Sequence, residues 1–484
     1  MRRAREAPRS SPLTGWRFVV AAVSLVVAAQ LVGAPAASAT RGLITGVAEP
    51  TFSSAANPDE LFDLTARANA ELVRIGVRWR SVAPRRPANP RDPADAAYDF
   101  SGVDAAVREA QARGFQVLLT ASLAPNWAEG PNRPDLDTAP PGTWDPDPVA
   151  FGDFAHAVAK RYSGDFVDPA RSELGPLPWV RHFEVWNEPN LATFLGPQWV
   201  GSEPRSPILY RELLNSFYDG VKAVRADNLV VGGSLAPYGD EPGRTRMRPL
   251  FFLRELFCLE GRRKLTPRQC PAVRADVLSV HPVNISGGPR RSAIHPDDAA
   301  SGDVDQVRRV LRAAETGGNV QPGGRRPLWA TEFWFWRLPG PNSEPGNVPP
   351  QRMARYVEEA LYLLWTNRVE VAIYYRLRDS EITQPPLGLF SFKSTGSKPK
   401  PVLQAFRFPF VAERRSKKSV RAWGKSPDAG RLSIEMRRGG KWRRVKRVSV
   451  RRGEVFTTDL RLRDAAILRA RVAGEQSLTW RQRR

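Results

Sequence analysis

Short runs rich in valine and isoleucine alternate with amphipathic segments from residue 41 to residue 410, and this alternation limits the possible folds more than any other feature of the chain. The runs have the length and composition of strands, and the segments between them have helical periodicity. Eight such units in about 370 residues predict a (β/α)8 TIM barrel; a doubly wound open sheet fits the eightfold count less well. The runs begin at Leu43, Leu72, Phe115, Val180, Leu229, Val277, Leu328 and Val369.

Helices are expected in the segments between these strands. One begins near Pro58 and another at Ser101, and the second is stopped by Gly114. The others are expected over 150–162, 208–226, 250–257, 304–315 and 351–365. Long loops rich in proline and aromatic residues follow the third and seventh strands, which places a site at the carboxyl ends of the strands, where barrel enzymes build them.

Two glutamates stand at strand ends on this predicted face. Glu188, in WNEPN, ends the fourth strand, and Glu332, in WATEFWF, ends the seventh. Cleavage of a glycosidic bond needs such a pair, one carboxyl as a protonated acid and the other as an ionised carboxylate. A lone glutamate before a proline is also typical of a turn or of a helix start, so the pairing is what favours catalysis.

WNEPN followed by TEFWF resembles the clan A glycoside hydrolases, and within them the family 39 or family 5 cellulase-like proteins, over residues 41–410. The resemblance implies that Glu188 is the general acid/base and Glu332 the nucleophile of a retaining reaction without a cofactor. It implies that Asn187 binds the sugar 2-hydroxyl and that Arg74 lies beside Glu332 and keeps it ionised.

One position departs from the clan pattern. His281 fits a histidine of the sixth strand, but Val283 stands where many members have a tyrosine that bonds the nucleophile. Either Tyr375, near the end of the eighth strand, supplies that hydroxyl, or the nucleophile lacks the partner.

Aromatic side chains flank the predicted site and suit the apolar faces of a pyranose. Trp127, Trp336 and Tyr375 are expected on the rim, in contact with substrate. Strand alternation predicts that Trp186 and Phe333 point away from it, between the barrel and the helices.

Residues 1–39 predict a secretory signal peptide, and hence a secreted, extracellular protein. Five arginines precede an apolar run from Phe18 to Val32, and Ala37, Ser38 and Ala39 form a cleavage pattern. The run is shorter than the roughly 20 residues that a membrane-spanning helix needs, so no transmembrane segment is expected in the mature chain.

Cysteine and histidine usage bears on compartment and metal content. After export, Cys258 and Cys270 can form a disulfide, and the alternative is two unpaired thiols. The four histidines are scattered and no cysteine stands at metal-ligand spacing from one, so no metal is expected.

The sequence pattern changes after about Pro409. Alternating stretches within 419–484 are joined at glycine-containing turns and predict a small β-sandwich. It resembles the immunoglobulin-like domains found behind secreted glycosidase barrels, so the domains are expected to be 40–410 for the barrel and 411–484 for an immunoglobulin-like β domain. The β domain has 23 Lys or Arg against 7 Asp or Glu. The positive electrostatic field of such a domain attracts polyanions such as acidic wall polymers. The alternative is that these charges only form a solvated surface without a binding role.

Three function classes follow from these features. The first is a secreted retaining glycoside hydrolase acting on an oligo- or polysaccharide. The second is a non-catalytic carbohydrate- or cell-wall-binding barrel. The third is a basic nucleic-acid- or wall-binding protein driven by the β domain, although no specific nucleic acid is expected as partner. Phosphate-loop, dinucleotide and serine-elbow motifs are absent from the sequence.

Overall fold

The computed structural model describes residues 42–55, 58–135, 137, 139–285, 287–336, 348–380 and 386–482. The predicted signal peptide, residues 1–39, lies outside the described residues. Within these ranges, no helix combines the length and the hydropathy needed to cross a membrane.

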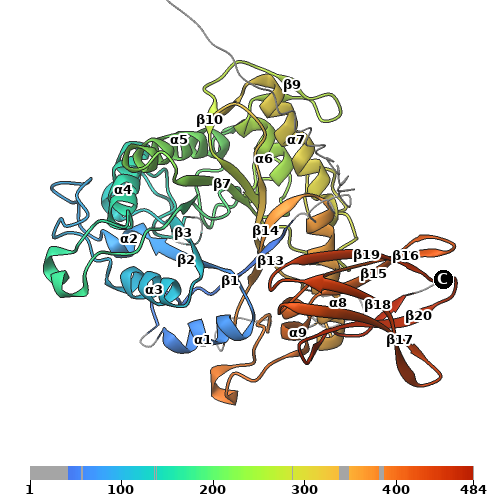
Figure 1. The fold of residues 1–484 in the computed structure, drawn as a ribbon. Helices are drawn as coiled ribbons and strands as arrows, with labels where there is room; N and C mark the ends of the chain where they lie inside the picture. Colours follow the sequence, from blue (N-terminus) through green and yellow to red (C-terminus); the bar gives the residue numbers. More distant parts are fainter. Residues whose placement is uncertain are drawn as a thin grey trace, which may run out of the picture. The chain divides into compact units, whose positions relative to one another are not determined.

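The eight expected strands form a closed parallel barrel (Figure 1). Their order around the barrel is β1, β14, β13, β11, β7, β4, β3 and β2. Valine and isoleucine favour these buried strands because branched side chains pack well on a pleated surface. The bounds are Ile44–Ala48 (β1), Leu72–Arg78 (β2), Gln116–Ser122 (β3), His182–Val185 (β4), Leu229–Leu235 (β7), Val277–Val280 (β11), Leu328–Phe333 (β13) and Val369–Tyr375 (β14).

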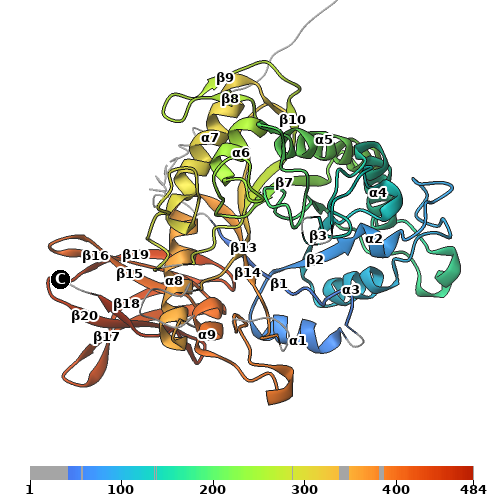
Figure 2. The ribbon, with the colours of Figure 1, turned by 180° about the vertical axis from the view of Figure 1, so that it is seen from behind.

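Helices lie outside the ring of strands, as Figures 1 and 2 show from opposite sides. Local signals in the sequence set their ends: Asp147, for example, caps one helix by accepting hydrogen bonds from the backbone N–H groups of Val149 and Ala150. The bounds are Asp59–Arg67 (α1), Trp79–Val82 (α2), Ser101–Ala112 (α3), Pro148–Arg161 (α4), Ser206–Val224 (α5), Pro249–Leu256 (α6), Val304–Gly317 (α7), Pro350–Thr366 (α8) and Pro401–Arg407 (α9).

Side chains that point into the barrel form an apolar layer with a polar layer above it. The apolar layer, nearer the N-terminal ends of the strands, includes Leu72, Leu118, Val277 and Trp329. Because side chains alternate along a strand, the residues two positions further on also point inward, and these are polar: Arg74, Thr120, Ser279 and Thr331. The apolar layer therefore closes the barrel below, and the polar layer faces the carboxyl ends of the strands.

The C-terminal residues form two antiparallel sheets, as the sequence predicted. One has the order β15, β16, β19, and the other β18, β17, β20, β21, with β22 paired to β20. The first strand begins at Phe410, earlier than the alternating pattern indicated. The bounds are Phe410–Ser416 (β15), Ser419–Lys425 (β16), Gly430–Arg438 (β17), Lys441–Val450 (β18), Val455–Arg461 (β19), Ala466–Val472 (β20), Glu475–Gln476 (β21) and Trp480–Gln482 (β22).

This β domain packs against the barrel through a shared hydrophobic core. The buried Trp423 of β16 contacts Tyr362 and Trp365 of α8, with ring centroids 5.5 and 5.9 Å apart. The ammonium of Lys425 pairs with Glu71, which precedes β2. The β domain therefore contacts α8 and residues at the N-terminal ends of the strands.

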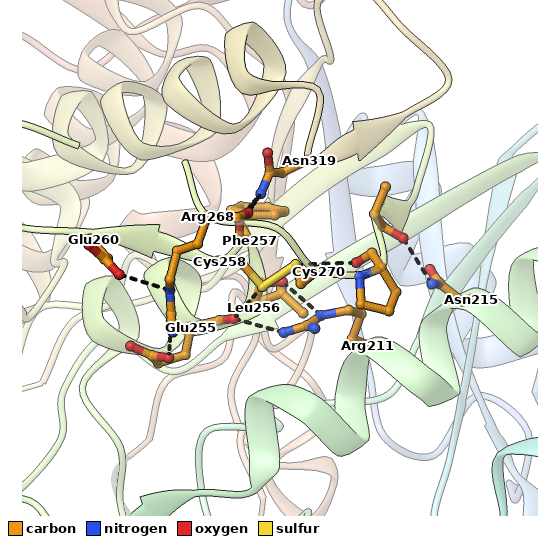
Figure 3. Close-up of a disulfide and its surroundings, with 12 residues drawn as sticks. Arg211, Asn215, Glu255, Leu256, Phe257, Cys258, Glu260, Arg268, Cys270 and Asn319 are labelled. Carbon is orange, nitrogen blue, oxygen red and sulfur yellow. Dashed lines mark hydrogen bonds and ion pairs between the residues drawn. A yellow bond between two sulfur atoms is a disulfide. The ribbon is translucent and has the colours of Figure 1, made fainter. Parts of the chain in front are cut away.

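A disulfide joins Cys258 and Cys270, as predicted from the sequence (Figure 3). It closes a loop that contains a short hairpin, Leu259–Glu260 (β8) with Thr266–Pro267 (β9). The remaining short strands are Trp199–Val200 (β5), Glu203–Pro204 (β6), Val273–Arg274 (β10) and Val320–Gln321 (β12).

Candidate active site

An ion pair inside the barrel supports the site from below. Nε of Arg74 donates to Oε2 of Glu184 at 2.6 Å, and the two side chains are only 8 % and 0 % exposed. The hydroxyls of Thr120 and Ser234 also donate to this carboxylate, at 2.8 and 2.6 Å. Burial by itself raises the pKa of Glu184, but the charges of Arg74 and His281 and the hydrogen bond from Ser234 outweigh it and hold the pKa below its usual value. Glu184 is therefore an ionised anchor for Arg74.

The rest of the Arg74 guanidinium positions two residues at the rim. Nη1 donates to Oε1 of Glu332 at 2.7 Å, and Nη2 donates to Oδ1 of Asn187 at 3.0 Å. A planar fork with fixed donor directions suits this task. One arginine from β2 thus fixes a carboxylate from β13 and an amide that follows β4.

A β-bulge turns Glu332 into the barrel. Ala330 pairs with Ala372 and Phe333 with Tyr374, so β13 has one residue more than β14 over this stretch. Counted from the inward Trp329, an unbroken strand would point Phe333 inward and Glu332 outward, the reverse of the arrangement predicted from the sequence. Because of the extra residue, Glu332 faces the barrel instead, and Phe333 is buried against Tyr374 on the outside.

The backbone after β4 turns sharply to present Glu188. Trp186 and Glu188 have positive φ angles of 66° and 43°, which non-glycine residues adopt at a cost of about 1–3 kcal/mol. The buried Trp186 indole donates to the carbonyl of Phe194 and holds the turn, and the Glu188 N–H donates to the carbonyl of Ser234. The outward position predicted for Trp186 agrees with this burial.

Glu188 and Glu332 face each other across His281. Nδ1 of the fully buried His281 lies 2.9 Å from Oε1 of Glu188 and 3.9 Å from Oε2 of Glu332. Carboxylate oxygens of the two glutamates lie within 4.8 Å of each other. Both line a cavity of about 390 Å³ at the carboxyl ends of the strands, to which β1, β2, β3, β13, β14 and the segment after β4 contribute.

Burial raises the pKa of Glu332, and the negative charges of Glu188 and Glu184 act in the same direction. His281 and Arg74 lower it, but the net direction is upward. The sequence predicted that Arg74 would keep Glu332 ionised. In the structure Arg74 does favour the ionised form, but it limits the rise in the pKa without reversing it.

The predicted substrate-binding residues are only partly brought together. Arg74, Asn187 and Tyr375 line the cavity, and His281 lies beneath it. Trp127 and Trp336 do not line it. The indole of Trp127 donates to the carbonyl of Ala83 and packs against Trp79. Beyond the bulge, the indole that reaches the cavity is that of Trp334.

Tyr375 lies near the two glutamates without replacing the missing tyrosine. Burial, followed by the charge of Glu332, raises its pKa to about 12, so the phenol is neutral at ordinary pH. Within the part of the chain that the structure describes, no hydrogen bond joins it to Glu332. Val283 is buried.

Glu184 and Glu49 were missed from the sequence. Glu49 lines the cavity and accepts a hydrogen bond of 2.8 Å from Nη2 of Arg376. A signal for Glu184 was present, because a charged residue between Phe183 and Val185 in a buried strand requires a partner. Glu49, just after β1, gave no comparable signal.

Glu188, His281 and Glu332 also form the type of cluster that can ligate a metal ion. The adjacent guanidinium of Arg74 argues against a cation there. It already occupies Oε1 of Glu332, and its positive charge repels a divalent ion. The cluster therefore fits a proton-transfer site better than a metal centre.

Comparisons with known proteins give only distant similarities. No protein-family model matches the sequence, and no curated protein matches it. Among solved structures, the GH39 enzyme from Xanthomonas axonopodis pv. citri is similar with a TM-score of 0.49 and 15% identity, over 87% of this chain and 92% of that chain. A monomeric beta-xylosidase from Caulobacter crescentus has a TM-score of 0.49 and 14% identity, over 87% and 94%. An endo-beta-1,4-mannanase from Thermotoga petrophila has a TM-score of 0.45 and 11% identity, over 92% and 98%. Values this low do not transfer a function, so the function is inferred from the site.

Proposed function

We propose that this chain is a retaining glycoside hydrolase. The observation that supports the proposal is the pair of glutamates, Glu188 and Glu332, whose carboxylate oxygens lie within 4.8 Å of each other in one cavity. Retaining enzymes hold their two carboxyl groups about 5–5.5 Å apart, whereas inverting enzymes leave about 6.5–9.5 Å for a water molecule. One oxygen of each carboxylate lies within 4.8 Å of the other, which agrees with the closer, retaining arrangement of the two groups.

The two glutamates have different surroundings, and these suit different roles. Arg74 bonds Glu332 and favours its ionised form, as a nucleophile requires. Glu188 has His281 as its neighbour and no arginine partner among the described residues. In the first step, Glu332 attacks the anomeric carbon and the glycosidic bond breaks, while Glu188 gives its proton to the leaving oxygen. In the second step, Glu188 takes a proton from water, and the oxygen of that water displaces Glu332 from the sugar.

Asn187 and the polar layer prepare this geometry before substrate binds. The Asn187 amide oxygen accepts a hydrogen bond from Arg74, and its NH₂ group has no partner among the described residues, so it can donate to a sugar hydroxyl. Such a bond contributes to rate if it strengthens in the transition state. Phe194, Trp334 and Tyr375 supply the aromatic surface of the cavity.

The first test is hydrolysis of a panel of aryl glycosides and polysaccharides by residues 40–484. Glu188→Ala and Glu332→Ala are expected to lose activity by at least a thousandfold, and Glu49→Gln, in a third carboxylate of the same cavity, by far less. Azide is expected to rescue both alanine variants on an activated substrate. It should give a glycosyl azide of retained configuration with Glu188→Ala and of inverted configuration with Glu332→Ala. Sugar binding without turnover on any substrate would instead favour the non-catalytic barrel.

The proposed place of action is outside the cell. The charged and apolar pattern of residues 1–39 supports export, and a disulfide between Cys258 and Cys270 is stable in an oxidising compartment. Expression of the full chain in a secreting host, followed by N-terminal sequencing of the medium, should give a protein that starts at Thr40. Retention of the protein inside the cell would contradict the proposal.

We further propose that the β domain binds an anionic cell-wall polymer through the outer face of its sheet. Residues paired across β18, β17 and β20 share this face, which we call the basic face: Arg431, Arg437, Arg444, Arg447, Arg469 and Arg471. Among the described residues of these strands, its one carboxylate is Glu435, already paired with Arg469 at 2.8 Å.

Binding to insoluble anionic wall polymer at increasing salt tests this role. Replacing Arg437, Arg444 and Arg447 by glutamine should weaken binding and reduce its dependence on salt. The matched control for net charge replaces three arginines on the barrel by glutamine: Arg108, Arg171 and Arg181. Equal binding by the two triple variants would show that net charge, and not the basic face, is responsible.

A further inference from the structure

Arg78 is a cation in the cavity for which the described residues supply no counter-ion. It is the last residue of β2, it is exposed, and it lines the cavity. The other charged residues of the lining have partners: Arg74 bonds Glu184 and Glu332, Glu49 bonds Arg376, and Glu188 bonds His281. Over the described ranges, Arg78 forms neither an ion pair nor a side-chain hydrogen bond.

Strand geometry directs Arg78 toward the substrate. Leu72, Arg74, Gly76 and Arg78 alternate with the outward, buried residues of β2, so all four share its inner face. At about 3.3 Å per residue, the backbone of Arg78 lies roughly 13 Å further along the strand than that of Arg74. Arg74 thus lies at the floor beside Glu332, and Arg78 stands at the rim.

The space between the two arginines is open. Gly76 lies between them, and a Cβ atom added there would meet no atom within 4 Å. Gly76 also lines the cavity. A larger side chain would fill this space, so the sequence leaves room between the reacting centre and the free guanidinium.

We infer that the substrate has an anionic group on the sugar, and that Arg78 binds it. A guanidinium presents paired N–H donors whose spacing matches a carboxylate, a sulfate or a phosphate. With a neutral glycan bound, the positive charge of Arg78 would lie beside the substrate without a partner. The inference rests on the proposed glycosidase activity and narrows its substrates to acidic glycans.

A neighbouring arginine provides the matched control. Arg80, two residues beyond Arg78, is also exposed, but its Nη1 donates to the carbonyl of Pro141 at 2.7 Å and it does not line the cavity. Substituting either arginine removes one positive charge from the same end of β2. A difference between the two variants therefore reports position and not net charge.

The test uses aryl glycosides that differ at one substituent. In both the gluco and the galacto series, the C6 group is CH₂OH, carboxylate, sulfate ester or phosphate ester. The quantity measured is the ratio of kcat/KM for each anionic glycoside to that for its neutral counterpart. Wild-type protein is expected to prefer one anionic substituent, and the preferred one identifies the acidic group. Arg78→Gln should lower that ratio about 10- to 100-fold, as expected for losing hydrogen bonds to a charged group, and Arg80→Gln should not.

A ratio that is the same in Arg78→Gln and wild type would overturn the inference while leaving the glycosidase proposal intact, as would a wild-type preference for the neutral sugars. If wild type hydrolyses nothing faster than the Glu188→Ala, Glu332→Ala double variant does, the glycosidase proposal fails. Calorimetric titration with the free anionic sugars then shows whether Arg78 binds the anionic group. Binding lost in Arg78→Gln but kept in Arg80→Gln supports the anion site, and equal binding or none to wild type overturns it.

Discussion

At the scale of single residues, the site depends on one buried guanidinium. Arg74 joins Glu184 below to Glu332 and Asn187 above, so its position determines that of the reacting carboxylate. Paired buried charges add little net stability, but removing one partner is costly because the other charge is left uncompensated.

Substitution of Glu184 tests this support. Glu184→Gln is expected to lower the free energy of unfolding by about 3–5 kcal/mol and to reduce kcat. Ser279→Ala removes a longer hydrogen bond of 3.2 Å to the same carboxylate and should cost about 1 kcal/mol. Denaturant unfolding of wild type, Glu184→Gln and Ser279→Ala measures the two changes in stability. Equal stability of Glu184→Gln and wild type would contradict the role of Glu184 as the anchor of Arg74.

The raised pKa of Glu332 predicts the acid side of the activity profile. The nucleophile must be ionised, so kcat/KM should fall as pH drops through a pKa above the usual glutamate value of about 4.3. Arg74→Met removes a positive charge that lowers this pKa, and the acid limb of the variant should move to higher pH. Profiles of kcat/KM against pH for both proteins measure this shift. An acid limb at or below the usual value in wild type would show that Glu332 does not control it.

At the scale of secondary structure, the strands could be predicted from sequence but not the irregularity at the end of β13. Branched residues in eight runs were enough to predict the barrel, because hydrophobic burial sets the pattern of each strand locally. The bulge after Ala330 depends on pairing with β14, a contact between distant residues. Which aromatic side chain beyond the bulge lines the cavity, Trp334 and not the predicted Trp336, depends on this contact and could not be predicted from the sequence. Neither could the partners of Glu184 on other strands.

Helix α8 contains a buried carboxyl that links stability to pH. Glu358 is 1 % exposed, and burial raises its pKa to about 8. The folded state therefore binds more protons than the unfolded state between about pH 4.5 and pH 8, so stability falls as pH rises across this range. Denaturant unfolding at several pH values should show a loss of a few kcal/mol in wild type and a much smaller one in Glu358→Gln. Parallel curves for the two proteins would exclude Glu358 as the cause.

At the scale of the whole molecule, the β domain and the barrel share one hydrophobic core. The sequence predicted this domain but left open whether it packs on the barrel or acts as an anchor for wall polymers. Trp423 is fully buried against α8, and Lys425 pairs with Glu71. The basic face is on the other sheet of the sandwich, so the packing of Trp423 against the barrel and the proposed polymer binding use different surfaces.

Because the barrel and the β domain share this core, we expect them to unfold together. Trp423→Ala should cost about 3–5 kcal/mol and lower the Tm of the whole chain, whereas Trp442→Ala, at a partly exposed position of the mostly exposed strand β18, should have a small effect. Calorimetry of wild type is expected to show one transition. Two separate transitions, with only one shifted by Trp423→Ala, would contradict the shared core.

Covalent labelling of Glu332 tests the central claim most directly. A 2-deoxy-2-fluoro aryl glycoside of a sugar that the protein hydrolyses should form a glycosyl-enzyme that breaks down slowly, because the fluorine destabilises the transition state of the second step. Mass spectrometry of the digested protein is predicted to find the sugar on the peptide that contains Glu332, and to find none on Glu332→Gln. Label on a different residue, or hydrolysis of the parent glycoside with inversion and no label, would contradict the account.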